Sequence, residues 1–208
     1  MVWKAEKGAL KEWLCKVLIK IGALKFGTFT LPSGALSPYY INLRIVPSFP
    51  EVFQKICSIY QRLVEEEIGL ASFERIGGIP LSALPLASCL SFTLRKPLVL
   101  IRREGEEHGR ERRVEGILMP GDRVLPVDDV ITTGRSLSYA VKALRHEGAV
   151  VEEAVVLVDR EEGGVRRLKE EGVRVHSLMT ITEAAETLHN FDIITEEEYE
   201  AILLRTKK

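Results

Sequence analysis

Apolar residues are spaced along this chain in two different ways. In residues 6–21 and 51–67 they recur every three or four positions, which predicts amphipathic helices. Residues 26–44 are rich in Thr, Tyr, Ser, Gly and Pro without a helical period, which indicates short strands joined by turns. Beyond residue 74, uninterrupted apolar runs alternate with amphipathic segments. We expect strands at 75–79, 97–101, 123–127, 151–158 and 173–178, and helices at 82–94, 134–147, 163–171, 181–188 and 196–204.

This alternation of strands and helices predicts an α/β fold. The expected strands are apolar throughout rather than at every second residue, which is typical of a parallel sheet covered by helices on both faces. No internal repeat or low-complexity linker divides the sequence, so we expect a single domain over residues 1–208. Such sheets bind ligands beyond the carboxyl ends of their strands, and a site is therefore expected there.

Composition excludes several classes of protein. Hydrophobic residues make up 46% of the 208 residues and charged residues 28%, a balance that excludes a disordered or collagen-like chain. The 29 Lys and Arg against 30 Asp and Glu leave no bulk attraction to nucleic acid or to an anionic membrane, so neither is expected as a partner. The three cysteines, Cys15, Cys57 and Cys89, show no metal-binding spacing, which favours core positions in a reducing, cytoplasmic protein.

The segment after the apolar run at 123–127 carries the clearest chemistry. Two adjacent carboxylates, Asp128 and Asp129, end the expected strand, and a Thr/Gly/Ser loop then opens a helix. Amides at a helix start, helped by hydroxyl groups, bind phosphate without a positive side chain. Carboxylates repel phosphate, so they suit hydroxyls or a divalent cation, and a ribose 5′-phosphate satisfies both halves. On the dipeptide alone, a turn with a helix cap at Thr133 or Ser136 is the simpler interpretation.

The whole segment 123–136 favours the chemical interpretation, because it closely resembles the signature with which type I phosphoribosyltransferases bind phosphoribosyl pyrophosphate (PRPP). The motifs G-x-x-x-x-G-K-[ST] and strand-G-x-G-x-x-G are absent, which weakens NTPase and dinucleotide-binding interpretations. Other segments occur in the order seen in orotate phosphoribosyltransferases. These segments are 26–42 (FGTFTLPSGALSPYYIN), 78–80 (GIP), 101–104 (IRRE), 108–109 (HG), 114–116 (VEG) and 158–160 (VDR).

The resemblance implies a fold, a reaction and an assembly. The fold is the type I phosphoribosyltransferase fold, a central mostly parallel sheet flanked by helices, with a small hood mainly in 1–45, a core over 50–180 and C-terminal helices over 181–208. The reaction transfers the phosphoribosyl group of PRPP to orotate, giving orotidine 5′-monophosphate and pyrophosphate in de novo pyrimidine synthesis. The implied cofactor is Mg²⁺, with no protein residue assigned as its direct ligand, and the implied assembly is a homodimer.

The resemblance also assigns roles to individual residues. Asp128 and Asp129 are expected on the ribose hydroxyls, as catalytic residues. Thr132 and Arg160 are expected to hold orotate, and a planar guanidinium suits its carboxylate. Tyr40 and Ile41 would line the base, although Tyr40 as core and Arg160 as a surface cation stay open. The remaining residues expected to bind PRPP are Val130, Ile131, Thr132, Thr133, Gly134, Arg135 and Ser136.

Residues 102–115 are charged, punctuated by glycine and almost free of apolar side chains, so we expect a mobile loop. In the related enzymes this loop closes over the site of the neighbouring subunit. The resemblance places Arg102, Arg103 and His108 on the diphosphate of PRPP, with Arg103 and His108 as catalytic residues. Cations on the leaving group lower the barrier as positive charge develops at the ribose C1 atom. A solvated hairpin is the alternative.

Several residues depart from the family pattern. Glu106 stands where active relatives have a loop lysine, and the resulting repulsion of about 1 to 4 kcal/mol would slow the reaction roughly tenfold to several hundredfold unless nearby arginines compensate. Pro32, Gly77 and Arg135 also replace common residues. Pro126 removes a ladder hydrogen bond from an expected central strand unless its nitrogen faces outward.

Two other functions stay open. A PRPP- or nucleotide-binding paralogue with weakened catalysis and a regulatory role would explain Glu106. A phosphoribosyltransferase for another base would use the same phosphate and ribose residues. The balanced charge disfavours a DNA-binding regulator.

Overall fold

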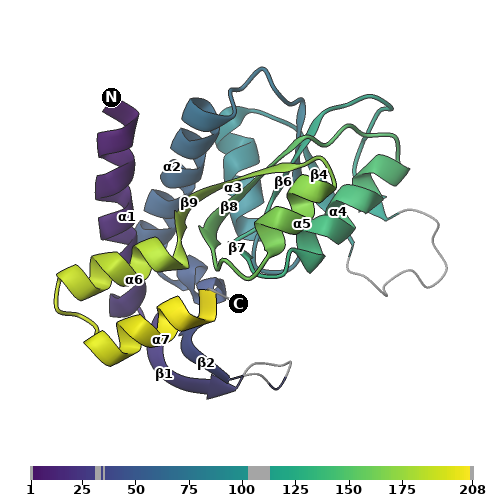
Figure 1. Ribbon diagram of the computed structural model, residues 1–208. Helices are drawn as coiled ribbons and strands as arrows, with labels where there is room; N and C mark the ends of the chain where they lie inside the picture. Colours follow the sequence, from purple (N-terminus) through teal and green to yellow (C-terminus); the bar gives the residue numbers. More distant parts are fainter. Residues whose placement is uncertain (1, 31–33, 35, 103–112, 207–208) are drawn as a thin grey trace.

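The structure, a computed structural model, describes residues 2–30, 34, 36–102 and 113–206 (Figure 1). Its main sheet has seven strands in the order β5-β4-β3-β6-β8-β7, with β9 also paired to β8. The β5 strand is antiparallel to β4, and the other ladders are parallel. The strands are β3 (Arg75–Gly78), β4 (Leu98–Ile101), β5 (Val114–Glu115), β6 (Val124–Val127), β7 (Val130–Ile131), β8 (Glu153–Asp159) and β9 (Arg174–Thr180). The expected α/β fold with a mostly parallel sheet is confirmed.

Helices flank this sheet (Figure 1). The first begins at Val2 instead of near residue 6, and its opening turn is anchored by Trp3, whose Nε1 donates to Glu67 Oε1 at 3.0 Å. No helix in the described ranges is long and apolar enough to cross a bilayer. The helices are α1 (Val2–Lys20), α2 (Pro50–Glu67), α3 (Leu84–Leu94), α4 (Arg135–His146), α5 (Gly164–Glu170), α6 (Ile181–Asn190) and α7 (Glu196–Thr206).

The main sheet is buried on both faces. Val155 and Leu157 of β8 pack into a hydrophobic cluster shared with α1, α2, α3 and α6, whereas Ala154 and Val156 pack into a second cluster with α4 and α5. Successive residues of a strand point to opposite faces. Because both faces are covered, β8 is apolar from Ala154 to Val158, as expected of a buried parallel strand.

A second, smaller sheet lies beside the main one. It pairs β1 (Leu24–Thr30) with antiparallel β2 (Leu36–Ile41), and the short 3₁₀ helix η1 (Leu43–Ser48) then leads to α2. In Figure 1 this small sheet lies next to α7, below the main sheet. Neighbouring side chains of β2 take opposite sides, so Tyr39 is fully buried and Tyr40 is 37% exposed.

Pro126 lies within the central strand β6 and does remove a ladder bond. The amides of Val124 and Asp128 donate to Val150 O at 2.9 Å and Val155 O at 3.0 Å. Alternate residues of a strand direct their N–H groups to the same neighbour, so Pro126 lacks the donor on this side. The neighbouring chain has one extra residue at this point. Positions 123 and 127 of one strand pair with positions 150 and 155 of its neighbour, so a separation of four residues faces a separation of five.

The segment 102–115 differs from a single loop at both of its ends. Val114 and Glu115 form β5, which pairs with Ile101 and Leu100 of β4, and Arg102 N–H donates to Arg113 O at 2.9 Å. Val114 is buried and anchors this end of the segment, although most of its neighbours in sequence are charged. The expected loop between these ends, residues 103–112, lies outside the described residues.

Candidate functional site

Asp128 and Asp129 lie in an extended segment that continues from β6 into β7 alongside β8. Asp128 N–H bonds to β8 as described above, and Leu157 N–H of β8 donates to Asp129 O at 3.0 Å. From the opposite direction, the hydroxyl of Tyr60 in α2 donates to Asp128 O at 2.7 Å. The backbone that carries both carboxylates is therefore held by the sheet and by a helix.

The two carboxylates have different surroundings. Asp128 is buried, and burial together with the neighbouring Asp129 raises the pKa of Asp128 well above its ordinary value. Each carboxylate accepts the next amide in the chain, that of Asp129 at 2.9 Å and that of Val130 at 2.9 Å. Neither aspartate forms an ion pair with another described residue. Asp129 is only half buried, so its remaining acceptor sites face open space.

The start of α4 presents backbone donors next to these carboxylates. Gly134 precedes the helix in a left-handed conformation with φ 73°, and no side chain caps the helix. Within the described chain, the amides of Arg135, Ser136 and Leu137 have no acceptor, as expected for the first turn of a helix. Such a turn is suited to an anion, because free N–H groups and the helix dipole point to the same place.

Gly164, at the start of α5, holds this turn in place. Its N–H donates to Thr132 O at 2.9 Å. A Cβ at Gly164 would come within 2.4 Å of Thr132 O and 2.8 Å of Gly134 N, distances that no side chain can occupy. The α4 turn and the loop after β8 are therefore packed backbone against backbone.

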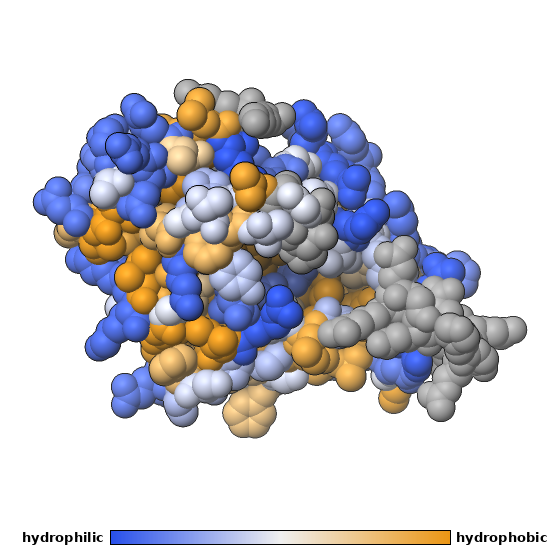
Figure 2. All heavy atoms as spheres, turned by 90° about the horizontal axis from the view of Figure 1, so that it is seen from below, coloured by the Kyte–Doolittle hydropathy of each residue, from blue (hydrophilic) through white to orange (hydrophobic). Residues whose placement is uncertain are grey.

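A cavity of about 470 Å³ opens beside these elements, between the main sheet, α4 and the chain after β2. Residues 42–44 and 80–82 complete its wall, and the Pro80–Leu81 peptide bond is cis. Figure 2, seen from the side of β1 and β2, shows hydrophilic and hydrophobic residues interspersed on this face of the molecule. Of the residues expected from sequence, those that line the cavity are Ile41, Asp129, Val130, Thr132, Ser136 and Arg160.

Arg160 enters this cavity from the loop after β8 and is 8% exposed. Its Nε donates to the hydroxyl of Tyr39 at 2.9 Å, and the guanidinium lies 4.7 Å from the centre of the Tyr39 ring. Nη2 lies 2.8 Å from Glu162 Oε1, but it makes no hydrogen bond of acceptable geometry. A buried guanidinium with donors left over is suited to an anionic ligand.

Arg102 and Arg135 line a second, smaller cavity of about 120 Å³, which shares Pro80 and Ser136 with the first. Arg102 Nη1 pairs with Glu115 at 2.8 Å, which offsets part of its charge. The departure at Arg135 adds a cation to the wall of this smaller cavity, at the start of α4.

Other expected site residues lie elsewhere. Asp128 is buried and Ile131 is 1% exposed inside the sheet, so neither lines the larger cavity. Tyr40 does not line it either, and its ring packs on Phe29 with centroids 5.6 Å apart. Arg103, His108 and the departure at Glu106 lie outside the described residues. Thr133 and Gly134 form the turn before α4.

Comparison with known proteins agrees with this geometry. The phosphoribosyl transferase domain family matches residues 50–189. An orotate phosphoribosyltransferase of Cenarchaeum symbiosum is 43% identical over 173 residues, which cover 83% of this chain and 86% of that protein. The chain belongs to the orotate phosphoribosyltransferase family.

Solved structures of the family share the fold. An orotate phosphoribosyltransferase from Aeropyrum pernix matches with a TM-score of 0.76 and 36% identity, covering 88% of this chain and 99% of that one. A Leishmania donovani UMP synthase matches with a TM-score of 0.82 and 31% identity over 94% of this chain, but this chain spans only 42% of its length. The orotate phosphoribosyltransferase fold thus occurs both alone and as part of a longer chain.

Three residues of the candidate site, Tyr39, Gly164 and Tyr60, were not expected from the sequence. The sequence predicts Tyr40 at the base instead of its neighbour Tyr39. The alternation of buried and exposed side chains along β2 distinguishes the two residues. Gly164 follows Gly163 and precedes a helix, so its sequence signal was that of an ordinary helix start. Tyr60 lies on the apolar face of α2, where its hydroxyl has no signature in the sequence.

Proposed function

We propose that this protein transfers the phosphoribosyl group of PRPP to orotate, giving orotidine 5′-monophosphate and pyrophosphate. The bond from ribose C1 to the diphosphate breaks, a bond from C1 to a ring nitrogen of orotate forms, and the nitrogen releases its proton. The observation that supports this most is the single cavity lined by the α4 turn, by Asp129 and by Arg160. These three features suit a phosphate, a ribose and an anionic base respectively.

The α4 turn is the proposed 5′-phosphate site. Its free amides and the hydroxyls of Thr132 and Ser136 provide donors from one rigid element. Asp129 has acceptor capacity toward the cavity and suits the ribose hydroxyls. Asp128 lies beneath and supports that carboxylate through the backbone. In this assignment the sugar and its phosphate are held by groups with different charges, which fixes the direction of the bound molecule.

The proposed base site lies at Arg160, with Thr132 and Ile41 beside it. The carboxylate of orotate would accept from the guanidinium donors that Tyr39 and Glu162 leave over. Tyr40, which we expected at the base from the sequence, remains a prediction that its position outside the cavity does not support.

Mg²⁺ is the proposed cofactor. In the part of the chain that the structure describes, no three His, Cys, Asp or Glu side chains come together to hold a metal ion. The cation would be bound mainly by phosphates and water with one protein carboxylate, which is common for Mg²⁺. Asp129 fits that role, because its half-buried carboxylate faces the cavity. When bound, Mg²⁺ neutralises charge on the departing diphosphate.

We further propose a cytoplasmic homodimer in which the loop between Arg102 and Glu115 reaches the neighbouring subunit, with Arg103 and His108 on the diphosphate. The pairing of β5 with β4 supports this, because it places the two described ends of that loop, Arg102 and Arg113, at the edge of the sheet next to the smaller cavity. Cysteines that are all free in the structure agree with a reducing compartment.

The test is the loss of orotate absorbance when PRPP and Mg²⁺ are added, with the reverse reaction run from orotidine monophosphate and pyrophosphate. We expect turnover in both directions and PRPP binding by calorimetry. PRPP binding with negligible turnover, restored by orders of magnitude in Glu106→Lys, would favour the regulatory paralogue instead. An adenine phosphoribosyltransferase of Saccharomyces cerevisiae shares the fold at 21% identity, so turnover of adenine but not orotate would favour another base.

A further inference from the structure

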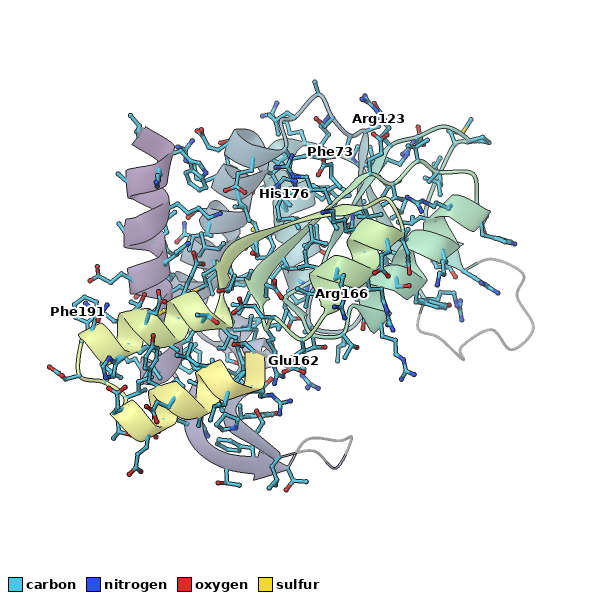
Figure 3. The ribbon with its side chains drawn as sticks, in the orientation of Figure 1. Phe73, Arg123, Glu162, Arg166, His176 and Phe191 are labelled. Carbon is cyan, nitrogen blue, oxygen red and sulfur yellow. The ribbon has the colours of Figure 1, made fainter. Side chains whose placement is uncertain are left out.

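The last helix of the structure contacts the residue that pairs with Arg160 of the proposed base site. Arg205, near the end of α7, donates from Nη1 to Leu36 O of β2 at 2.6 Å and from Nε to Glu162 Oε1 at 3.3 Å. Figure 3 shows Glu162 beside the end of α7. The helix thus connects the small sheet to the loop that carries Arg160, and this connection is separate from its packing on α6.

Glu162 lies between two guanidinium groups. The oxygen that faces Arg205, Oε1, is also the atom 2.8 Å from Arg160 Nη2. The side chains of Arg160, Glu162 and Arg205 are 9%, 18% and 20% exposed, so these charges interact with little screening by water. Two positive charges share one negative charge, so the three side chains together keep a net positive charge, and of the three it is Arg160 that lines the cavity.

The remaining contacts of Arg160 fix its direction. Tyr39 takes Nε and supports the guanidinium plane with its ring, while Glu162 holds the Nη2 side. The loop itself is tied to α6, where Glu161 Oε2 accepts Thr182 N–H at 2.9 Å. Arg160 is therefore held at its backbone and at both ends of its guanidinium.

We infer that Arg205 and Glu162 are positioning residues that make Arg160 select a base bearing a carboxylate. Glu162 holds the guanidinium of Arg160 in place. Arg205 takes part of the negative charge of Glu162, so Arg160 keeps its attraction for an anion. Without Arg205, Glu162 would neutralise Arg160 as a simple pair. The inference rests on the proposed function and extends it to residues that do not touch the substrate.

The experiment compares Arg205→Ala with the wild type using orotate and using uracil, the same ring without the carboxylate. The KM for orotate should rise by a factor of about 5 to 30, while kcat and the KM for PRPP stay within about twofold. The preference for orotate over uracil in kcat/KM should fall by the same factor. Arg205→Lys keeps the charge and should recover most of the loss, and Leu204→Ala, an exposed neighbour on α7, should change none of these values.

Coupling to Arg160 separates positioning from a general loss of structure. In an Arg160→Ala background, adding Arg205→Ala should leave the KM for orotate unchanged, because its effect acts through Arg160. An equal additional rise there, or an unchanged orotate preference in Arg205→Ala alone, overturns the inference while the proposed function stands. If Arg205→Ala does not fold, Arg205→Gln removes the charge with a longer side chain and should show the same rise in the KM for orotate, and an unchanged KM there overturns the inference. A wild type that binds PRPP and does not consume orotate overturns both.

Discussion

Two clusters of buried and partly buried polar groups lie at opposite ends of the main sheet, and they are built differently. At the amino ends of β8 and β9, His176 Nε2 lies 2.6 Å from Glu153 Oε2 and its Nδ1 lies 3.5 Å from Glu67 Oε2. Lys7 and Trp3 of α1 donate to the other oxygen of Glu67 at 2.7 Å and 3.0 Å. Figure 3 shows His176 at the end of the sheet away from Glu162.

The pKa values of the carboxyl groups are shifted in opposite directions in the two clusters. Burial acts to raise the pKa of Glu67, but bonds from Lys7, Trp3 and His176 outweigh it and the pKa is lowered. Burial also raises the pKa of Asp128, where the nearest charge is another carboxylate and adds to the rise. The amino-end cluster is satisfied by the protein itself. The carboxyl-end cluster keeps free amides and unused guanidinium donors beside the cavity, which suit a ligand.

The largest expected difference between the clusters concerns activity. Asp129→Asn removes the charge proposed to meet the ribose and should lower kcat/KM by about 10² to 10³ with little change in the thermal midpoint. Steady-state kinetics and a thermal melt measure the two effects. Glu67→Gln is the matched control from the other cluster, and it should lower the midpoint while kcat/KM is kept. Similar activity losses in both variants would remove the distinction.

The next effect concerns stability. His176→Leu leaves the partly buried Glu67 and Glu153 carboxylates without their shared partner. It should reduce the free energy of unfolding by about 1 to 3 kcal/mol, while kcat/KM of the folded protein is unchanged. Urea unfolding measures the change. His189→Leu removes a histidine whose side chain is 34% exposed and should cost less than about 1 kcal/mol. Equal costs would show that the amino-end cluster adds no stability of its own.

The smallest effect is a pH dependence. Because the pKa of Asp128 is raised in the folded state, the native protein binds this proton more tightly than the unfolded chain, and stability falls as pH rises above the ordinary value of 3.8. Asp128→Asn cannot titrate, so its stability relative to wild type should increase as pH rises from 4 to 8, as urea unfolding at several pH values measures. Parallel stability curves for the two proteins would contradict the raised pKa.

The same contrast explains what the sequence could predict. The order of strands and helices was readable because both faces of the sheet are buried, which makes β8 a continuous apolar run. Asp129, Thr132 and Ser136 were readable because they stand close together along the chain. Both predictions depend on neighbours in sequence, and the fold is confirmed by the structure and by the family.

What could not be predicted depends on distant pairs and on single-residue choices. Tyr39 and Arg160 are 121 positions apart, and no local pattern connects them. Arg205 meets Glu162 from a helix whose sequence indicated only packing. The strands β5 and β7 have two residues each and exist through their partners rather than their own propensity.

The contact between Gly134 and Gly164 has a consequence for substrate length. The first glycine belongs to the proposed phosphate turn, and the second follows the loop that carries Arg160. Because their backbones touch, main-chain contacts set the separation between the loop proposed to bind the phosphate and the loop that carries Arg160. Under the proposed function, the distance between these two loops is fixed. An enzyme redesigned for a longer or shorter nucleotide would therefore need both loops rebuilt together.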